Sequence, residues 1–167
     1  MKRFALILLY IYFVITSTYA QSEELTGSLI SAVRSNNLTG VQESLAQGAD
    51  VNASVASRSP PLTYAVSAGN AEMVQLLLQN GADVGLNDSM GRCPVIIAVQ
   101  EGNIDILKIL AAHGGDLSHR HVFPGAGAQT PLHTAVQEDD PQMVKYLLSQ
   151  NVSMETRNSS GQSPLML

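Results

Sequence analysis

The chain repeats itself at a regular interval, and this repeat constrains its fold more than any other feature. A four-residue motif, GADV or a variant of it, begins at Gly48, Gly81, Gly114 and Asn151. A second motif, centred on proline and leucine, begins at Pro60, Cys93, Thr130 and Ser163. Both motifs keep the same spacing except for one longer step, so four extra residues lie between Gly114 and Thr130. Two independent motifs with the same period and the same insertion indicate a protein built from stacked units.

Each unit predicts two helices joined by a tight turn. Proline at the first helical position loses no intrahelical hydrogen bond, so the recurring prolines mark helix starts. We expect these first helices at about Pro61–Ala68, Pro94–Glu101 and Pro131–Glu138. Second helices follow after the turns Gly69–Asn70, Gly102–Asn103 and Asp139–Asp140, with apolar residues three and four apart on one buried face. The glycines that open the GADV motifs, and Asn151 in the last copy, suit the left-handed residue that ends a helix.

This pattern resembles the ankyrin repeat, whose hallmark Thr-Pro-Leu-His-x-Ala is matched in full by Thr130–Ala135. The resemblance implies an all-α solenoid of stacked helix-turn-helix units with β-turn fingers. It extends over nearly all of residues 21–167, as about four repeats and a truncated fifth. A capping repeat at about 25–57 keeps the apolar positions Leu29, Ala32, Val41 and Leu45 without the proline, and full repeats follow at about 58–90, 91–127 and 128–160.

The fifth repeat starts at Gly161, and the sequence stops at Leu167 inside its expected first helix. A solenoid normally finishes with a repeat whose outer face is polar. Two interpretations follow. Either the sequence is the amino-terminal part of a longer repeat protein, or Leu165–Leu167 packs as a short cap.

Residues 1–20 have the layout of a secretory signal peptide. Lys2 and Arg3 precede an uncharged, mostly apolar run, and Thr18–Ala20 offers small residues at a cleavage site. The apolar run is shorter than the approximately 20 residues that a membrane-spanning helix needs. We therefore expect a mature chain that starts at Gln21, is secreted or periplasmic and has no stable membrane span. An uncleaved anchor and a buried helix of the fold are the alternatives.

Charge and motif content argue against several classes of function. The formal net charge is −5, and it becomes −7 if Lys2 and Arg3 are removed, so nucleic acid is not an expected partner. The chain contains neither a glycine-rich phosphate loop nor a Gly-x-Ser-x-Gly nucleophile motif. Cys93, the single cysteine, occupies the Thr position of a helix-start motif and is interpreted as a half-buried structural residue. We expect no catalysis and no cofactor.

The histidines leave one chemical alternative open. His119 and His121 lie in the insertion, six and eight residues after His113, and three imidazoles could bind a divalent metal ion. His113 in the last turn of a helix and His133 within the repeat motif have structural explanations, and Arg120 between the other two repels a cation. A small exported metal-binding protein or enzyme that uses this insertion is therefore the alternative to a binding module.

The resemblance implies protein binding through the finger tips and the concave face of the first helices. The variable positions of that face include Tyr64, Ile97 and Thr134. Arginines at Arg58, Arg92, Arg120 and Arg157 fall one to each finger, and such a row would suit an acidic protein partner. The insertion, Ser118–Gln129, lengthens one finger and brings in Phe123, which either contacts the partner or folds back onto the neighbouring helices.

Five glycosylation sequons matter only if the protein passes through a eukaryotic secretory route. They begin at Asn37, Asn52, Asn87, Asn151 and Asn158. Glycans at three of these positions, Asn52, Asn87 and Asn158, would crowd the fingers. The oligomeric state cannot be derived from the sequence.

Overall fold

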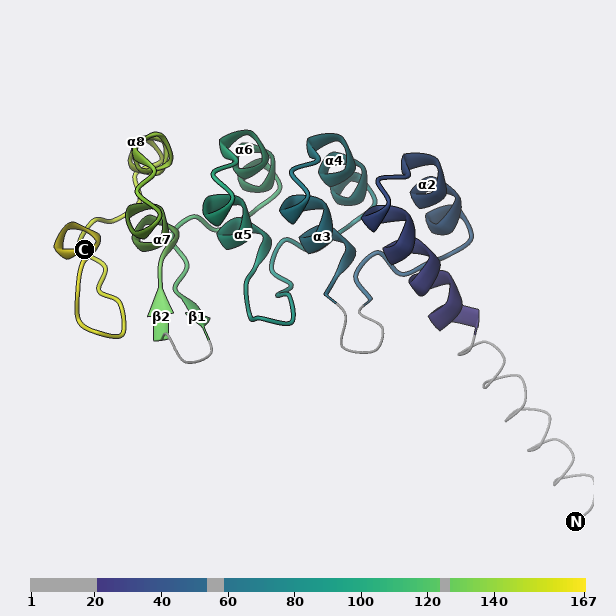
Figure 1. Ribbon diagram of the computed structural model, residues 1–167, viewed down its shortest axis with the longest axis horizontal. Helices are drawn as coiled ribbons and strands as arrows, with labels where there is room; N and C mark the ends of the chain where they lie inside the picture. The colour runs from purple at the N-terminus through teal and green to yellow at the C-terminus, as the bar shows by residue number, and fades with distance from the viewer. Residues whose placement is uncertain (1–20, 54–58, 124–126) are drawn as a thin grey trace, which may run out of the picture.

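The computed structural model describes residues 21–53, 59–123 and 127–167 and forms an elongated row of helix pairs (Figure 1). A helix at residues 21–34 opens the described chain. The elements that follow are α2 (Leu38–Ala46), α3 (Pro61–Ser67), α4 (Ala71–Gln79), α5 (Pro94–Gln100), α6 (Ile104–Ala112), β1 (His121–Phe123), β2 (Gly127–Gln129), α7 (Pro131–Gln137), α8 (Pro141–Ser149) and the short 3-10 helix η1 (Pro164–Met166). The expected first helices are confirmed to within one residue at their ends.

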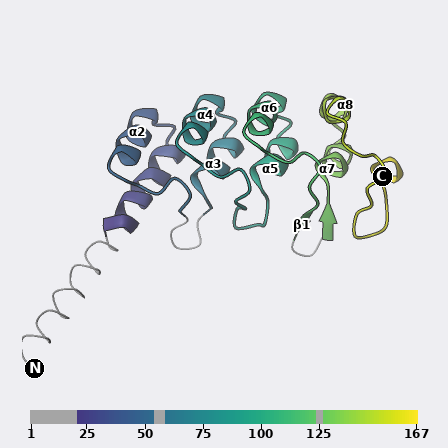
Figure 2. The same cartoon turned by 180° about the vertical axis from the view of Figure 1, so that it is seen from behind.

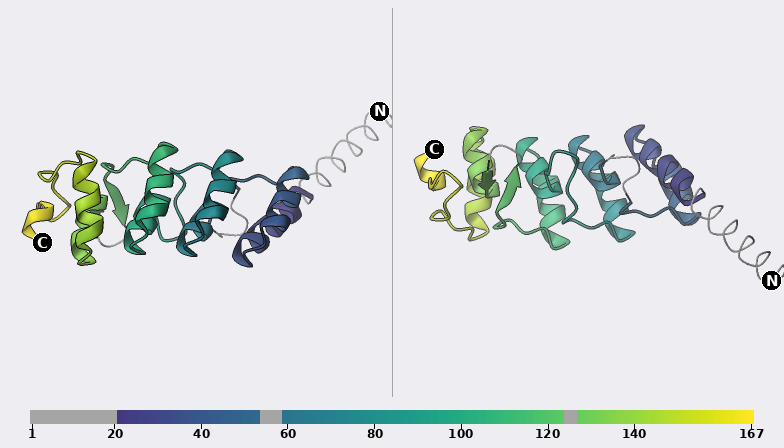
Figure 3. Two further views of the ribbon diagram at one scale, coloured as in Figure 1. Left: turned by 90° about the horizontal axis from the view of Figure 1, so that it is seen from above. Right: turned by 90° about the horizontal axis from the view of Figure 1, so that it is seen from below.

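The helices form two rows. Figure 1 shows α2, α4, α6 and α8 in one row, with the 21–34 helix, α3, α5 and α7 in the other. The view from behind in Figure 2 and the views from above and below in Figure 3 show the same order, with the 21–34 helix at one end of the row and η1 at the other. The connecting loops project on the side of the first helices. The fold is therefore the predicted solenoid, with one small addition: the insertion forms a two-stranded antiparallel sheet.

Backbone conformation at the helix ends follows the repeat. Gly48, Gly81 and Gly114 have φ of 93°, 85° and 90°, and Asn151 has φ of 58°, so these residues are left-handed as expected. Each second helix begins after a side chain that accepts a hydrogen bond from a backbone N–H of its first turn. These N-cap residues are Asn37, Asn70, Asn103 and Asp140.

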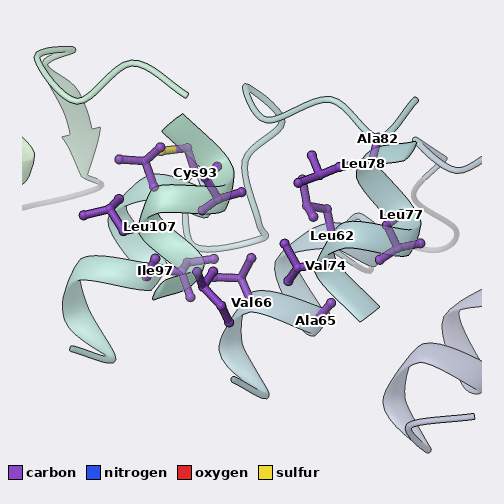
Figure 4. Packing of buried hydrophobic residues seen from close by; sticks show 14 of the residues in the cluster. Leu62, Ala65, Val66, Val74, Leu77, Leu78, Ala82, Cys93, Ile97 and Leu107 are labelled. Carbon is purple, nitrogen blue, oxygen red and sulfur yellow. The ribbon is translucent and has the colours of Figure 1, made fainter. Parts of the chain in front are cut away.

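One continuous apolar core runs through the stacked repeats. Its fully buried side chains include Leu29, Leu62, Leu77, Ile97, Leu107 and Leu147. Figure 4 shows this packing at the boundary of α3 and α5, where Val66 and Ile97 lie together. Because apolar side chains are buried between neighbouring repeats, each repeat is stabilised by its contact with the adjacent one.

The last residues do not form the short cap that was one of the two interpretations. Pro164 is buried, and η1 packs on α7, but Leu165, Met166 and Leu167 are 72%, 58% and 46% exposed. A single 3-10 turn directs only its proline toward α7, so the three apolar side chains beyond it are left in contact with solvent.

Candidate functional site

The first-helix face contains one accessible residue of the three expected there. Tyr64 is half-buried, and the guanidinium of Arg34 lies 5.6 Å from the centre of its ring. Ile97 is only 1% exposed and Thr134 3%. Ile97 and Thr134 are therefore covered in this structure, and Tyr64 is the accessible one of the three. Contact of these residues with a partner stays a prediction.

The exposed part of this face lies at the carboxyl ends of the first helices. Gln100 is half-buried there, and the exposed residues at these helix ends are Ser31, Arg34, Ser67, Ala68, Glu101, Gln137 and Glu138. Most of these side chains are polar, and the charged residues directly after α5 and α7 are both glutamates. The exposed part of the first-helix face is therefore polar and mildly acidic.

Arg92 closes its own finger instead of projecting from it. Its Nε and one terminal nitrogen each lie 2.8 Å from Oδ2 of Asp88, and its other terminal nitrogen donates to Gln100 at 3.1 Å. The second carboxylate oxygen of Asp88 accepts from the backbone N–H groups of Met90 and Arg92. With Asp88 only 9% exposed, this ion pair is a structural element of the finger.

The last finger has the same backbone geometry without the ion pair. Asn158 replaces Asp88, and its side-chain oxygen accepts from the backbone of Ser160 and Gln162 at 3.0 and 2.9 Å. Gln162 takes the position of Arg92, because each donates its backbone N–H to the turn side chain four residues earlier. The arginines therefore occupy different turn positions in different fingers.

The other finger arginines differ in what they offer to a partner. Arg157 donates to the carbonyl oxygen of Gly161 at 2.6 Å, within its own finger. Arg58 lies outside the described residues. Arg120 is exposed, and no ion pair or hydrogen bond of its side chain is found among the described residues. Arg92 and Arg157 thus bind within their own turns, and binding of an acidic partner by the row of arginines stays a prediction.

The insertion forms a projecting hairpin. β1 and β2 pair with His121 opposite Gln129 and Phe123 opposite Gly127. Val122, the middle residue of β1, is 69% exposed. The backbone N–H of Ser159 donates to the carbonyl oxygen of Ala128 at 3.1 Å, so the hairpin is held against the last finger. The side chain of Phe123 lies outside the described residues, and its two alternative positions stay open.

A pocket of about 400 Å³ lies between this hairpin and the preceding finger. Its lining includes Val84, Cys93, Val95, His119, Arg120 and His121. Sγ of Cys93 lies 3.4 Å from Nε2 of His121 and also accepts from the backbone N–H of Ile96, at the start of α5. No motif in the sequence indicates the contact between Cys93 and His121, because the two residues are far apart in the chain.

The electrostatics of this pair do not favour nucleophilic catalysis. Burial raises the pKa of the Cys93 thiol, and burial together with the charge of His119 lowers the pKa of His121 to about 4. At neutral pH the pair is therefore a thiol and a neutral imidazole. An activated cysteine requires the opposite, a lowered thiol pKa beside a protonated base. Cys93 is 3% exposed, so it is a fully buried helix cap and not half-buried as expected.

In the part of the chain that the structure describes, the histidines are not arranged to bind a metal ion. The rings of His119 and His121 are 4.8 Å apart, edge to face. No group of three or more His, Cys, Asp or Glu residues in residues 21–53, 59–123 and 127–167 is arranged to bind a metal ion. His133 contacts Thr130 and the carbonyl oxygen of Gln162, and His113 contacts that of Ile109, as structural residues do.

At two of the sequons near the fingers, the asparagine side chain makes hydrogen bonds within the protein. Asn158 is 8% exposed, and its amide oxygen accepts two backbone hydrogen bonds. The amide of Asn52 donates to Gly81 and accepts from Asp83 of the next repeat. The side chains that remain exposed are Asn37, Asn87 and Asn151.

The comparisons with known proteins identify the repeat. Residues 29–121 match a family model that describes three copies of the ankyrin repeat, and residues 129–159 match the model of a single ankyrin repeat. A search of curated proteins gave no significant match. In the part of the chain that the structure describes, no helix has the length and apolar character needed to cross a membrane. The two family matches together include most of the chain, which thus belongs to the ankyrin-repeat family.

Proposed function

We propose that this protein is exported and binds a protein partner through the hairpin finger and the adjacent first-helix face, without catalysing a reaction. Ankyrin repeats generally mediate protein–protein interaction. The observation that carries the proposal is the hairpin: a projecting pair of strands with Arg120 and Val122 exposed close together in the sequence. An exposed cation near an exposed apolar side chain, on a backbone held by hydrogen bonds, suits an interface anchor.

The same geometry favours a partner segment that is acidic and partly apolar. Arg120 attracts a carboxylate, and Val122 loses contact with water when an apolar side chain covers it. The pocket beside the hairpin adds Val84, which is half-buried, to this surface. Tyr64 with Arg34 offers a second contact toward the amino-terminal end of the same solenoid.

A matched pair of charge reversals tests this surface. Arg120→Glu should weaken partner binding and its dependence on salt, because it removes the exposed cation of the hairpin. Lys108→Glu is the control. It makes the same change of net charge on α6, where Lys108 is exposed and pairs with exposed Asp105. Each variant is used as bait in affinity capture from the exported compartment, and circular dichroism checks that helicity is unchanged.

The outcomes separate three possibilities. A protein retained by wild type and Lys108→Glu but lost with Arg120→Glu supports the hairpin. Equal losses from both variants would indicate a general effect of net charge. Retention by all three would contradict the hairpin and shift attention to Tyr64 and Arg34.

The export component rests on residues 1–20, which lie outside the described residues. Their charged start, apolar run and small residues support cleavage after Ala20. Amino-terminal sequencing of the protein recovered outside the cytoplasm should begin at Gln21. Soluble cytoplasmic protein that still begins at Met1 would contradict export.

A further inference from the structure

The two edges of the hairpin differ in what they contact. Figure 1 shows β2 on the side of the last finger and β1 on the side of α5. At the β2 edge, the backbone N–H of Ala128 donates to the hydroxyl of Ser159, and its carbonyl oxygen accepts from the backbone N–H of Ser159. A residue of the last finger therefore satisfies both backbone groups that Ala128 directs away from β1.

The register of the hairpin places the equivalent groups of β1 on its other edge. Successive residues of an antiparallel strand direct their backbone groups alternately toward the paired strand and away from it. Val122 lies opposite Ala128, so Val122 turns its backbone groups away from β2 just as Ala128 turns its own away from β1. Among the described residues, no hydrogen bond of the N–H or the carbonyl oxygen of Val122 is found. β1 therefore presents one donor and one acceptor at a strand edge.

Open space lies along this edge. The pocket between the hairpin and the preceding finger, about 400 Å³ in volume, is lined by every residue from His119 to Val122. Its opposite wall includes Gly85, Asn87 and Gly91 of the finger. In the described chain no backbone hydrogen bond joins that finger to β1. Because the two glycines carry no side chain, another backbone can approach the edge closely.

The side chains around the edge favour a segment that is both apolar and acidic. Of the exposed large hydrophobic residues in the described chain, the two that precede α7 are Met90, 56% exposed on the finger, and Val122 on the hairpin. Both fingers that bound the pocket thus carry an exposed apolar side chain. Arg120 supplies an exposed cation, whereas the carboxylate of Asp116 accepts from the backbone N–H of Ser118 within its own turn. An extended segment with apolar and acidic side chains is complementary to this edge.

We propose that the protein partner adds an extended strand to the free edge of β1, in the pocket between the hairpin and the preceding finger. The added strand forms two hydrogen bonds with the backbone of Val122. One of its apolar side chains packs on Val122 and Met90, and an acidic side chain lies at Arg120. The proposal rests on the proposed function of the hairpin and adds the conformation in which the partner segment binds.

Calorimetric titration with a synthetic peptide tests the proposal. The probe is a short peptide of alternating valine and glutamate, blocked at both ends, and the wild-type protein should bind it saturably. In a strand, alternate backbone nitrogens face opposite edges. Methylation of the alternate set that faces β1 should weaken binding at least about fivefold, because it removes the donor to the carbonyl oxygen of Val122. Methylation of the other set is the matched control and should leave the affinity unchanged.

A pair of protein variants tests the same edge from the other side. Val122→Pro removes the N–H that faces the pocket and no hydrogen bond to β2, so it should weaken peptide binding at least about fivefold. Val122→Ile keeps the N–H and the branched apolar side chain and should bind as wild type does. Circular dichroism and thermal melts check that both variants fold, and the methylated peptides test the unaltered protein independently of them.

The outcomes distinguish this proposal from the proposed function. Absence of saturable peptide binding, or equal weakening by both methylated sets, would overturn strand addition. So would a protein dimer that the peptide dissociates, because a second copy would then occupy the edge. A captured partner that is lost with Arg120→Glu but retained by Val122→Pro would also overturn it and leave the proposed function standing. Peptide binding that depends on the Val122 N–H, with capture unaffected by Arg120→Glu, would support the edge and contradict the proposed function.

Discussion

The second and fourth repeats carry the same four apolar residues in their second helices and differ in what surrounds them. In α4, Val74 and Leu78 are covered by the next repeat, whereas the equivalent Val144 and Leu148 of α8 face a groove. The equivalent leucines Leu78 and Leu148 are therefore buried in one repeat and exposed in the other. Burial in a solenoid depends on the neighbour, and a repeat in isolation does not define its own core.

The starts of the first helices extend this comparison. α7 begins after Thr130, whose hydroxyl lies 2.7 Å from Nδ1 of His133 in a capping box. α5 begins after Cys93, whose sulfur accepts from the backbone N–H of Ile96 and also contacts His121 of the insertion. The side chain at this turn position thus has local partners in both repeats and an additional, distant partner in the third.

Truncation inside the covered repeat should have the largest effect. Leu77 is fully buried in α4, and Leu77→Ala should lower the free energy of unfolding by about 2–5 kcal/mol, because it removes apolar contacts and leaves a cavity. Chemical denaturation monitored by circular dichroism measures the change. A loss below about 0.5 kcal/mol, the size expected of a surface substitution, would contradict the burial of this face.

Truncation of the equivalent residues Leu78 and Leu148 should lower the free energy of unfolding by different amounts in the two repeats. Leu78→Ala should cost about 2 kcal/mol or more, because the side chain is 7% exposed between two repeats. Leu148→Ala should cost less than about 1 kcal/mol, because the side chain is 37% exposed. Equal costs in the same denaturation experiment would show that Leu148 is as well covered in solution as Leu78.

Acid should destabilise the third repeat, because the helix cap Cys93 contacts His121. The equivalent cap of the fourth repeat, Thr130, contacts His133 instead. The folded pKa of His121 is about 4, below its ordinary value of 6.5, so the unfolded chain binds the proton first. The stability that His121 contributes is present above about pH 6.5 and is lost as the pH falls toward 4. Because His121 is partly exposed and solvent screens its charge, the free energy of unfolding should fall by only about 1–2 kcal/mol.

Unfolding free energies measured from pH 7 to pH 4 test this dependence. His121→Gln should remove that part of the decline, while His113→Gln, at the exposed end of α6, should keep it. An unchanged pH dependence in His121→Gln would mean that the imidazole is solvated in the folded state.

Exchange of the two helix caps should give the smallest effects. Thr130→Cys should lower stability by about 0.5–1 kcal/mol, because a thiol is a weaker acceptor than a hydroxyl at an N-cap. Cys93→Thr should raise stability by a similar amount. Thermal melts measure both, and destabilisation by Cys93→Thr would show that the contact with His121 outweighs the cap.

The repeat, the helix boundaries and the left-handed helix ends could all be predicted from the amino-acid sequence, because proline, glycine and asparagine act through local backbone geometry. The position of the insertion between Gly114 and Thr130 could be predicted as well. These features depend only on residues a few positions apart in the chain. A motif that recurs at a regular interval therefore indicates the same local structure in each repeat.

The accessibility of the candidate site residues depends instead on tertiary packing. Ile97 and Thr134 are buried in the stack of first helices, and Arg92 is bound by Asp88 and Gln100, and the motif alone indicates neither the burial nor these contacts. The contact of Cys93 with His121 was equally unpredictable. It depends on how the hairpin of the insertion folds against the start of α5, and the repeat motif does not encode that arrangement.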